Sequence, residues 1–334
     1  MKTKVAINGF GRIGRAAFKI MLEKESCEVV GINDLTDAKT LAYLLKYDSI
    51  FRRYKRDVSA EDGAIIVDGV RYPLSAEPDP SALPWKDLEV DVVLECTGRF
   101  VKDGAAYAHI DAGAKRVVLS APAKGDGDVE TRVIGVSEAE AESTHVTSGA
   151  SCTTNCISPV ARVMVDTFGV EKAMMTTIHS YTATQNLQDG PHKDPRRGRA
   201  AAQNMIPTST GAAIATTKVV PELVDKFDGF AVRVPTINVS LTDMTFLLKQ
   251  EVTPQEVNDA LIKASSGEMS GVLGVTDEPL VSSDFIGDPR SSIVDLSLTK
   301  VVDGDLVKVV SWYDNEWGYS NRLVESAEKV GSFL

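Results

Sequence analysis

The segment Val5-Ala6-Ile7-Asn8-Gly9-Phe10-Gly11-Arg12-Ile13-Gly14 decides the fold of the first part of the chain. Its first four residues form a short apolar run that stops at a glycine, which is typical of a buried strand. Apolar side chains then recur with helical spacing over residues 15–25, and residues 28–33 form a second strand-like run. A strand, a helix and a strand within about 30 residues predict a βαβ unit.

Gly9, Gly11 and Gly14 form a G-x-G-x-x-G pattern between this strand and this helix, and Asp34 ends the second strand. The glycines allow a tight turn, close approach of a pyrophosphate and close packing of the helix, whose N-terminus attracts the phosphates. A carboxylate at the position of Asp34 accepts hydrogen bonds from ribose hydroxyls and repels a 2′-phosphate, so the pattern favours NAD over NADP. The alternative interpretation is a tight glycine turn beside an unrelated surface aspartate.

The pattern of strand-like runs changes near residue 150. Before it, strand-like runs at 91–95 and 116–120 flank a possible crossover helix at 101–113, which predicts a mostly parallel sheet with helices on both faces. After it, longer runs at 173–179, 230–234, 238–250 and 306–313 mix polar with apolar residues, which indicates an antiparallel sheet. Residues 253–256 open a helix with a capping box, and residues 180–203 lack periodicity and form a long, functional loop.

The overall composition limits the function classes. A length of 334 residues suggests two domains, and a net charge of −11 argues against nucleic acid or an anionic membrane as a partner. No apolar segment is long enough to span a bilayer, and no signal peptide is apparent. Four cysteines are too few for a disulfide framework, so we expect a reducing compartment and a cytoplasmic protein.

The most informative stretch for chemistry is Ser151-Cys152-Thr153-Thr154-Asn155-Cys156, which is small and polar and precedes a helix-like run at 157–168. A thiol at a helix N-terminus is stabilised as thiolate by the dipole and the free backbone N–H groups. The same N–H groups can stabilise an oxyanion. Pro159 complicates this interpretation, because the spacing alone also allows a helix that begins at Pro159 with Ser158 as its cap.

Two less specific interpretations of Cys152 have to be weighed. Cysteine is among the most buried residue types, so an inert buried thiol is one alternative. Cys152 and Cys156 also have a spacing compatible with zinc, but no second Cys/His pair stands at ligand spacing. We therefore expect no metal site and interpret Cys156 as a packing residue.

The chain resembles the glyceraldehyde-3-phosphate dehydrogenase family over essentially its whole length. The segments that carry the resemblance are 8–15 (NGFGRIGR), 95–100 (ECTGRF), 119–122 (LSAP), 151–156 (SCTTNC), 179–185 (HSYTATQ), 206–213 (IPTSTGAA), 231–235 (AVRVP) and 311–320 (SWYDNEWGYS). The resemblance implies an α/β fold with a doubly wound, Rossmann-type NAD domain at 1–151, completed by the C-terminal segment 316–334. It implies an α+β catalytic domain at 152–315 with a mixed, largely antiparallel sheet.

The resemblance also implies the roles of individual residues. Cys152 matches the nucleophile and His179 the base that takes its proton; without the resemblance, His179 is equally well interpreted as a structural histidine. The residues that match phosphate-binding positions, for the substrate phosphate and for inorganic phosphate, are Thr182, Thr184, Arg233, Ser151, Thr153, Arg196, Thr210 and Gly211. Three arginines stand at 196–199, and their spacing does not say which one faces phosphate. The residues that match cofactor contacts are Gly9, Gly11, Arg12, Ile13, Gly14, Asn33, Asp34, Ser120, Asn315 and Tyr319.

Two details bear on cofactor choice and two depart from the family pattern. Asp34 and Gly190-Pro191 resemble NAD-using members. Pro78 stands where many members carry an arginine near the adenine, so that contact is in doubt. Gly149 stands where asparagine is usual, and we expect it to loosen the turn before the nucleophile.

The function that the resemblance implies is the NAD-dependent oxidation and phosphorylation of glyceraldehyde 3-phosphate through a cysteine thioester, by a homotetramer in glycolysis or gluconeogenesis. Inorganic phosphate is the second substrate, and the loop from Ser180 contacts a neighbouring subunit's cofactor site. Erythrose-4-phosphate dehydrogenase, which hydrolyses its acyl-enzyme, is the nearest alternative. A non-catalytic NAD-binding protein on the same fold is a second alternative, against which the retention of the site residues argues.

Overall fold

The computed structural model describes residues 2–137 and 144–334. Among these residues, 2–132, 144–150 and 320–334 form one compact unit, and 133–137 and 151–319 form a second. The predicted boundaries at 151/152 and 315/316 lie close to the divisions at 150/151 and 319/320. The sequence analysis did not place residues 133–137 in the second unit, where a side chain at Gly135 would contact Val272.

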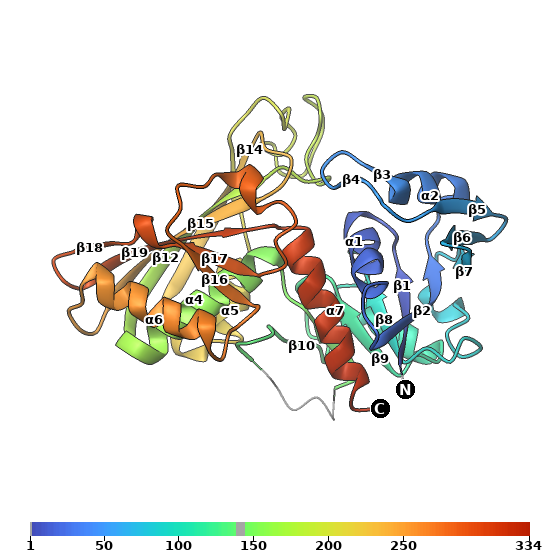
Figure 1. The fold of residues 1–334 in the computed structure, drawn as a ribbon, viewed down its shortest axis with the longest axis horizontal. Coiled ribbons are helices and arrows are strands. Elements are labelled where there is room, and N and C mark those ends of the chain that lie inside the picture. The colour runs from blue at the N-terminus through green and yellow to red at the C-terminus, as the bar shows by residue number, and fades with distance from the viewer. Residues whose placement is uncertain (1, 138–143) are drawn as a thin grey trace. The chain divides into compact units, whose positions relative to one another are not determined.

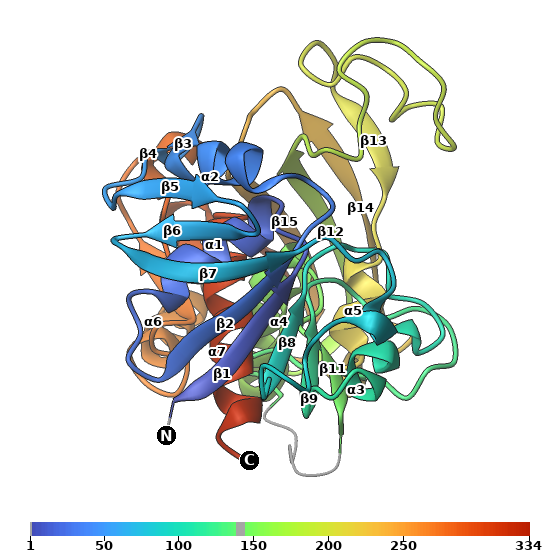
Figure 2. The same ribbon diagram turned by 90° about the vertical axis from the view of Figure 1, so that its right-hand side faces the viewer.

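A nine-stranded sheet forms the centre of the first unit (Figures 1 and 2). Its strands, in spatial order, are β10 (Glu130–Thr131), β11 (Val146–Ser148), β9 (Arg116–Leu119), β8 (Val92–Glu95), β1 (Thr3–Asn8), β2 (Cys27–Asn33), β7 (Val70–Ser75), β6 (Ala64–Val67) and β5 (Val58–Glu61). All pairings from β10 to β7 are parallel, and the two pairings among β7, β6 and β5 are antiparallel. The predicted doubly wound, mostly parallel sheet is confirmed, and the strand order reverses at β1, beside the glycine turn.

The helices of the first unit are α1 (Arg12–Met21), α2 (Ala38–Lys46) and α3 (Ala108–Asp111), together with the part of α7 (Trp317–Gly331) from residue 320 onward. The end of helix α7 lies close against β1, as shown by Gly331, where an added Cβ would overlap the side chain of Thr3. Lys24 also donates to Glu328 at 3.1 Å. A short antiparallel pair, β3 (Tyr47–Asp48) and β4 (Arg52–Arg53), follows α2.

The crossover helix expected over 101–113 is wrong in length. The structure has a 3₁₀ turn at Ala105–Tyr107 that continues into the four-residue helix α3. Gly104 and Gly113 have left-handed φ angles of 74° and 104°, which end regular helix on both sides. Further 3₁₀ turns lie at Pro80–Ala82, Pro221–Leu223, Ser282–Phe285 and Leu296–Leu298.

The second unit is built on an eight-stranded mixed sheet (Figure 1). Its order is β13 (Ile206–Ser209), β14 (Phe227–Val234), β12 (Val170–Ser180), β15 (Ser240–Leu248), β19 (Leu306–Tyr313), β17 (Ser292–Asp295) and β16 (Leu273–Thr276), with β18 (Lys300–Val302) also paired to β19. The pairs β12–β14 and β16–β17 are parallel and the others antiparallel, which confirms the largely antiparallel catalytic domain. Helices α4 (Cys152–Phe168), α5 (Ala212–Thr217) and α6 (Pro254–Ser266) complete the unit.

Helix α4 positions the predicted nucleophile. It begins at Cys152, so the alternative start at Pro159 is wrong. Ser151 caps the helix through an Oγ that accepts from the N–H of Thr154 at 3.1 Å. The helix continues through Pro159, although proline lacks the N–H that would bond the carbonyl of Asn155. The apolar face of α4, including Val160, is buried against the sheet, and this burial offsets the lost bond.

Candidate active site

The glycine turn after β1 has three glycines with three separate roles. Gly9 has a φ of +93°, and a Cβ there would lie 2.8 Å from the nitrogen of Thr97. A Cβ at Gly14 would lie 2.1 Å from the carbonyl oxygen of Gly9, so this glycine allows α1 to pack against the turn. A Cβ at Gly11, the N-cap of α1, would meet no atom within 4 Å. Gly11 therefore faces open space at a helix N-terminus, where a diphosphate fits.

A pocket of about 310 Å³ lies beside this turn. It is lined by Asn8, Gly9, Gly11, Asn33, Asp34, Leu35, Glu77, Pro78, Cys96, Thr97, Arg99 and Phe100. The carboxylate of Asp34 accepts from the N–H groups of Phe10 at 2.8 Å and Thr36 at 2.9 Å, which holds it beside the turn. The first unit thus has a helix N-terminus open to a phosphate and a carboxylate suited to ribose hydroxyls in one pocket, and these residues fit NAD.

The remaining cofactor residues predicted in the first unit lie close to this turn or on neighbouring strand ends. Arg12 and Ile13 open α1, and the guanidinium of Arg12 donates to Asp48 at 2.8 Å. Ser120 follows β9, and its N–H donates to the carbonyl of Glu95 at 2.9 Å. The first unit therefore contains the predicted cofactor residues at the start of α1 and the one that follows β9.

The predicted catalytic pair lies within hydrogen-bonding reach in the second unit. The Sγ of Cys152 is 3.5 Å from the Nε2 of His179. Cys152 is the first residue of α4, whereas His179 lies near the end of β12. A thiol at a helix N-terminus beside an imidazole is the arrangement that activates a cysteine nucleophile.

His179 is oriented by groups on its other side. Its Nδ1 lies 2.7 Å from the carbonyl oxygen of Ser180 and 2.9 Å from Nη1 of Arg233. Arg233 can only donate, and its Nη1 also donates to the Ser180 carbonyl at 3.1 Å, so Nδ1 and Nη1 compete for this oxygen. In the tautomer whose Nδ1 donates to the carbonyl, Nε2 presents its lone pair to the thiol. The parallel register pairs His179 with Arg233, which places the two side chains on the same face of the sheet.

Burial and the charge of Arg233 set the protonation of the pair. Burial, aided by this charge, lowers the pKa of His179 to about 3, so the imidazole is a neutral base at physiological pH. Burial raises the pKa of the Cys152 thiol, while Arg233 and the N–H groups of Thr153 and Cys152 act to lower it. These shifts favour a thiol beside a neutral imidazole as the resting pair, an arrangement in which proton transfer inside the pair would give a thiolate.

The other cysteines have a different environment. Burial raises the pKa of Cys156 to about 11, and it also raises the pKa values of Cys27 and Cys96. All four thiols are free. Among the residues that the structure describes, no group of three or more His, Cys, Asp or Glu side chains is arranged to hold a metal ion.

Tyr313 is a site residue to which the sequence analysis gave no role. Its hydroxyl lies 2.9 Å from Oγ1 of Thr153 and 2.9 Å from Oγ1 of Thr177, and its ring meets the His179 ring edge-on at 6.0 Å. It therefore ties the start of α4 to strand β12, the two elements that carry the catalytic pair. Its sequence signal is only that of an apolar strand residue, because the threonine partners are distant in the chain.

The predicted phosphate residues offer hydroxyl and guanidinium groups. The Oγ1 atoms of Thr182 and Thr184 lie 2.8 Å apart. The Nε of Arg233 is buried and has no hydrogen-bond partner in the described chain, which is the state expected of a donor that serves a ligand. Thr210, whose Oγ1 accepts from the N–H of Ala212, and Gly211 precede α5.

The structure distinguishes two of the clustered arginines. Arg196 is exposed, whereas Arg197 is half-buried and donates to Oγ1 of Thr208 at 2.8 Å. The charge of Arg197, and not that of Arg196, acts on the pKa values of His179 and Arg233. Arg197 therefore lies nearer to the catalytic pair than Arg196, a distinction that spacing could not make.

Asn315 and Tyr319, the cofactor residues predicted in the second unit, are both buried. The hydroxyl of Ser240 accepts from the N–H of Ser180 at 3.2 Å and donates to Oδ1 of Asn315 at 2.9 Å. This orients the amide so that Nδ2 of Asn315 is available as a donor. One hydroxyl thus connects the residue after His179 with Asn315, a predicted cofactor contact.

Comparison with known proteins matches both halves of the chain. Residues 3–103 match "Glyceraldehyde 3-phosphate dehydrogenase, NAD binding domain", and residues 151–315 match "Glyceraldehyde 3-phosphate dehydrogenase, C-terminal domain". Glyceraldehyde-3-phosphate dehydrogenase 1 of Bacillus cereus is 54% identical over 332 residues, which cover 99% of each chain. The chain belongs to the glyceraldehyde-3-phosphate dehydrogenase family.

Other relatives of this family agree. The glyceraldehyde-3-phosphate dehydrogenase of Geobacillus stearothermophilus is 52% identical over 334 residues, with 99% of each chain covered. That of Mycobacterium tuberculosis is 52% identical over 342 residues, with both chains covered completely. As a glyceraldehyde-3-phosphate dehydrogenase family member, the chain is an oxidoreductase with NAD as its cofactor, which confirms both predictions. In the described part of the chain, no helix has the length and apolar character needed to cross a membrane.

Proposed function

We propose that the chain oxidises D-glyceraldehyde 3-phosphate to 1,3-bisphosphoglycerate with NAD and inorganic phosphate, through a thioester on Cys152, in glycolysis or gluconeogenesis. The observation that carries this proposal is the 3.5 Å approach of the Cys152 sulfur to Nε2 of a buried, neutral His179. Family membership supports the same reaction.

The first half of the reaction uses the catalytic pair. Nε2 of His179 takes the thiol proton, and Sγ of Cys152 adds to the aldehyde carbon to give a hemithioacetal. The N–H groups at the start of α4 stabilise the developing oxyanion, which takes the proton back from His179 to become a hydroxyl. His179, neutral again, then removes this hydroxyl proton as hydride leaves the carbon. NAD, when bound, supplies the acceptor for the hydride that leaves this carbon, and the carbon remains attached to sulfur as a thioester.

The second half of the reaction uses the phosphate-binding residues. A phosphate oxygen attacks the thioester carbon, the C–S bond breaks, and Cys152 leaves as a thiolate that is protonated again from His179. Thr182, Thr184 and Arg233, whose Nε has no protein partner, suit the phosphate of the substrate. Ser151, Thr153, Thr210 and Gly211 are assigned to inorganic phosphate. We assign Arg197 to this second anion in place of Arg196, because its charge reaches the catalytic pair.

Asn315 is assigned to the nicotinamide carboxamide. Ser240 leaves its Nδ2 as a donor, which suits a carbonyl oxygen and selects the ring face presented to the substrate. We place Tyr319 at the same cofactor, and we propose a homotetramer in the cytoplasm whose loop from Ser180 contacts a neighbouring subunit. Exposed apolar side chains on this loop and beyond it, such as Leu187 and Met205, support subunit contacts.

The test is NADH formation from glyceraldehyde 3-phosphate, followed at 340 nm with and without phosphate, and with arsenate as a substitute. We expect turnover that requires either anion. Erythrose 4-phosphate is the comparison substrate. Equal rates without phosphate, together with a preference for this substrate, would instead support the hydrolytic alternative, and no oxidation of either aldehyde would leave a non-catalytic NAD-binding protein.

A further inference from the structure

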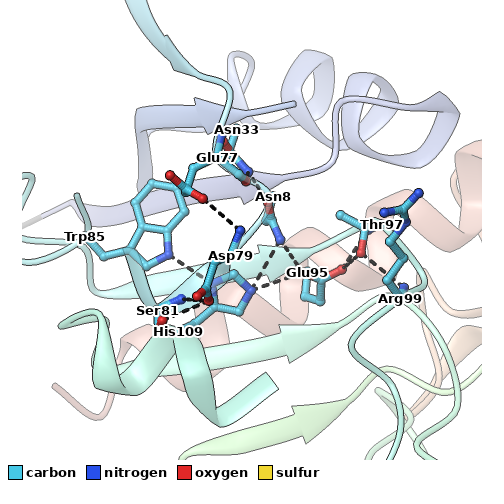
Figure 3. A network of polar contacts seen from close by, with 10 residues as sticks. All are labelled: Asn8, Asn33, Glu77, Asp79, Ser81, Trp85, Glu95, Thr97, Arg99 and His109. Carbon is cyan, nitrogen blue, oxygen red and sulfur yellow. Dashed lines mark hydrogen bonds and ion pairs between the residues drawn. The ribbon is translucent and has the colours of Figure 1, made fainter. Parts of the chain in front are cut away.

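A completely buried carboxylate lies at the end of β8 in the first unit, outside the catalytic pair (Figure 3). Glu95 accepts hydrogen bonds from Nδ2 of Asn8 at 2.6 Å, from the N–H of Thr97 at 2.8 Å and from the hydroxyl of Thr97. It also lies 3.0 Å from Nε2 of His109. Every polar contact that the described residues make to Glu95 comes from a potential donor, so both oxygens of the carboxylate serve as acceptors.

His109 does not neutralise this charge. Nε1 of Trp85 lies 2.9 Å from Nδ1 of His109, and an indole N–H can only donate. Nδ1 therefore holds a lone pair, Nε2 holds the hydrogen, and the imidazole donates to Glu95 as a neutral group. His109 is itself completely buried.

Two asparagine amides extend from Glu95 in one direction (Figure 3). Since Nδ2 of Asn8 faces the carboxylate, its Oδ1 accepts from Nδ2 of Asn33 at 2.7 Å. Oδ1 of Asn33 then accepts from the N–H of Glu77 at 2.9 Å and the hydroxyl of Ser75 at 3.0 Å. The backbone N–H of Glu77 cannot reverse its polarity, so both ends of this amide chain require the same orientation.

The amide chain forms part of the cofactor pocket. Asn8, Asn33, Glu77 and Thr97 all line it. Asn33 holds residues 75–77 through its bonds to Ser75 and Glu77. The same segment contacts Asp34, the residue predicted to bind ribose, because the N–H of Asp34 donates to the carbonyl of Ser75 at 3.0 Å. The orientation imposed by Glu95 is thereby transmitted to the wall of the pocket beside Asp34.

We propose that Glu95 is a positioning residue for NAD, which acts by orienting the Asn8–Asn33 amide chain and so holds the adenosine side of the pocket in shape. Only a carboxylate fits this position. A glutamine there would turn an N–H toward Asn8 and His109 or toward the N–H of Thr97, whichever oxygen it replaced. The indole N–H of Trp85 and the backbone N–H of Glu77 can only donate, so neither can become an acceptor and relieve that conflict.

The experiment is Glu95→Gln in the full chain, with Kd measured calorimetrically for NAD and for ADP-ribose, which lacks the nicotinamide. We expect Kd to rise about 10-fold or more for both ligands, and kcat at saturating NAD to stay within about twofold. Glu25→Gln, an exposed glutamate of the same unit, is the matched control. A Kd within about twofold of the native value for both ligands would overturn the proposal.

The proposal depends on NAD as the cofactor and not on the proposed reaction. The binding measurement therefore remains decisive even if aldehyde oxidation fails, in which case only the kcat comparison is lost. If Glu95→Gln does not fold, Asn33→Ala interrupts the chain with Glu95 intact. It should raise Kd for ADP-ribose by a similar factor, and an unchanged Kd would count against the proposal.

A double-mutant cycle separates orientation from packing. Asn33→Asp alone places an acceptor against Oδ1 of Asn8 and should weaken ADP-ribose binding. Added to Glu95→Gln, it lets Asn8 turn over, donate to the new carboxylate and accept from the introduced amide. The contacts of that amide with His109 and of the new carboxylate with the Glu77 carbonyl stay unfavourable, so the rescue is partial. The double variant should therefore bind at least about threefold more tightly than additivity predicts, and simple additivity would contradict an orienting role.

Discussion

The cofactor turn and the catalytic pair are built in opposite ways. The turn from Gly9 to Gly14 is one contiguous segment whose shape follows from missing side chains. The catalytic centre takes Cys152 from a helix start, and His179 and Arg233 from two strands that are paired in parallel. The first is a local backbone property, whereas the second exists only after distant strands have found their register.

This difference explains what each site tolerates. A side chain added at Gly9 meets backbone atoms that cannot move aside, so the turn is sensitive to volume. The catalytic pair is sensitive to charge and proton position, because burial and Arg233 hold the imidazole neutral. Substitutions in the two regions should therefore fail in different assays, one in binding and the other in chemistry.

The largest effect is expected from Cys152→Ala. Without the sulfur no thioester forms, so aldehyde oxidation should fall by about 10⁴-fold or more while NAD binding persists. Stopped-flow NADH formation and calorimetric NAD titration measure the two properties. Cys156→Ser, one helical turn further on, is the control and should retain activity. Near-native turnover of Cys152→Ala would remove the covalent mechanism.

His179→Asn should have the next largest effect, a loss of about 10²- to 10⁴-fold in kcat. Because burial raises the pKa of the thiol, thiolate forms and alkylation accelerates as pH rises. His179, with its pKa near 3, stays neutral and available as a proton acceptor throughout the neutral range. Below the thiol pKa, alkylation proceeds through the form in which the proton has moved to His179 and the imidazolium stabilises the thiolate, so loss of His179 should shift the iodoacetamide alkylation profile to higher pH. An unchanged profile would contradict the pairing.

Gly9→Ala and Gly11→Ala test the turn as a matched pair. Gly9→Ala forces alanine into a left-handed conformation, at a cost of about 1–2 kcal/mol before any clash with Thr97, and should weaken NAD binding about 10- to 100-fold. Gly11→Ala should cost less than about 1 kcal/mol in urea unfolding, yet still weaken NAD binding because its Cβ enters the ligand's space. Equal unfolding free energies for the two variants would contradict the separate roles.

The smallest effect is expected for Asp34→Gly combined with Pro191→Ser. Removing the carboxylate relieves its repulsion of a 2′-phosphate, so the ratio of kcat/KM for NAD over NADP should fall about 10-fold. Both coenzymes are compared in the single and double variants. If NADP use remains negligible, Asp34 is not the determinant of selectivity.

The sequence predicted well those features that are local in the chain. The glycine turn and the capping box at Thr253 and Glu256 have short-range signals, and the structure contains them. The same holds for the eight predicted strand-like runs, which correspond to β1, β2, β8, β9, β12, β14, β15 and β19. The start of α4 was ambiguous because Pro159 usually marks a first turn, and burial of the helix overrides that preference. The helix expected over 101–113 is too long because Gly104 and Gly113 adopt left-handed conformations, which the apolar spacing of the sequence does not reveal.

The features that sequence could not supply depend on long-range contacts. Tyr313 joins Thr153 to Thr177 across widely separated elements, and Arg197 is distinguished from Arg196 only by its burial and its bond to Thr208. Glu95 has no local signal of burial beyond its place at the end of an apolar run. In each case, tertiary packing brings the residue to its hydrogen-bond partners, which are distant in the sequence.

The parallel register of β12 and β14 has a consequence for how catalytic rate can be adjusted. Backbone hydrogen bonds hold His179 and Arg233 together, whereas the sulfur is carried by a helix that rests on the sheet through apolar side chains such as Val160 and Met164. The gap between sulfur and imidazole therefore depends on the thickness of this hydrophobic layer as well as on the Tyr313 hydroxyl that joins α4 to β12. Conservative changes of core volume beneath α4, far from any substrate atom, become a means of tuning proton transfer.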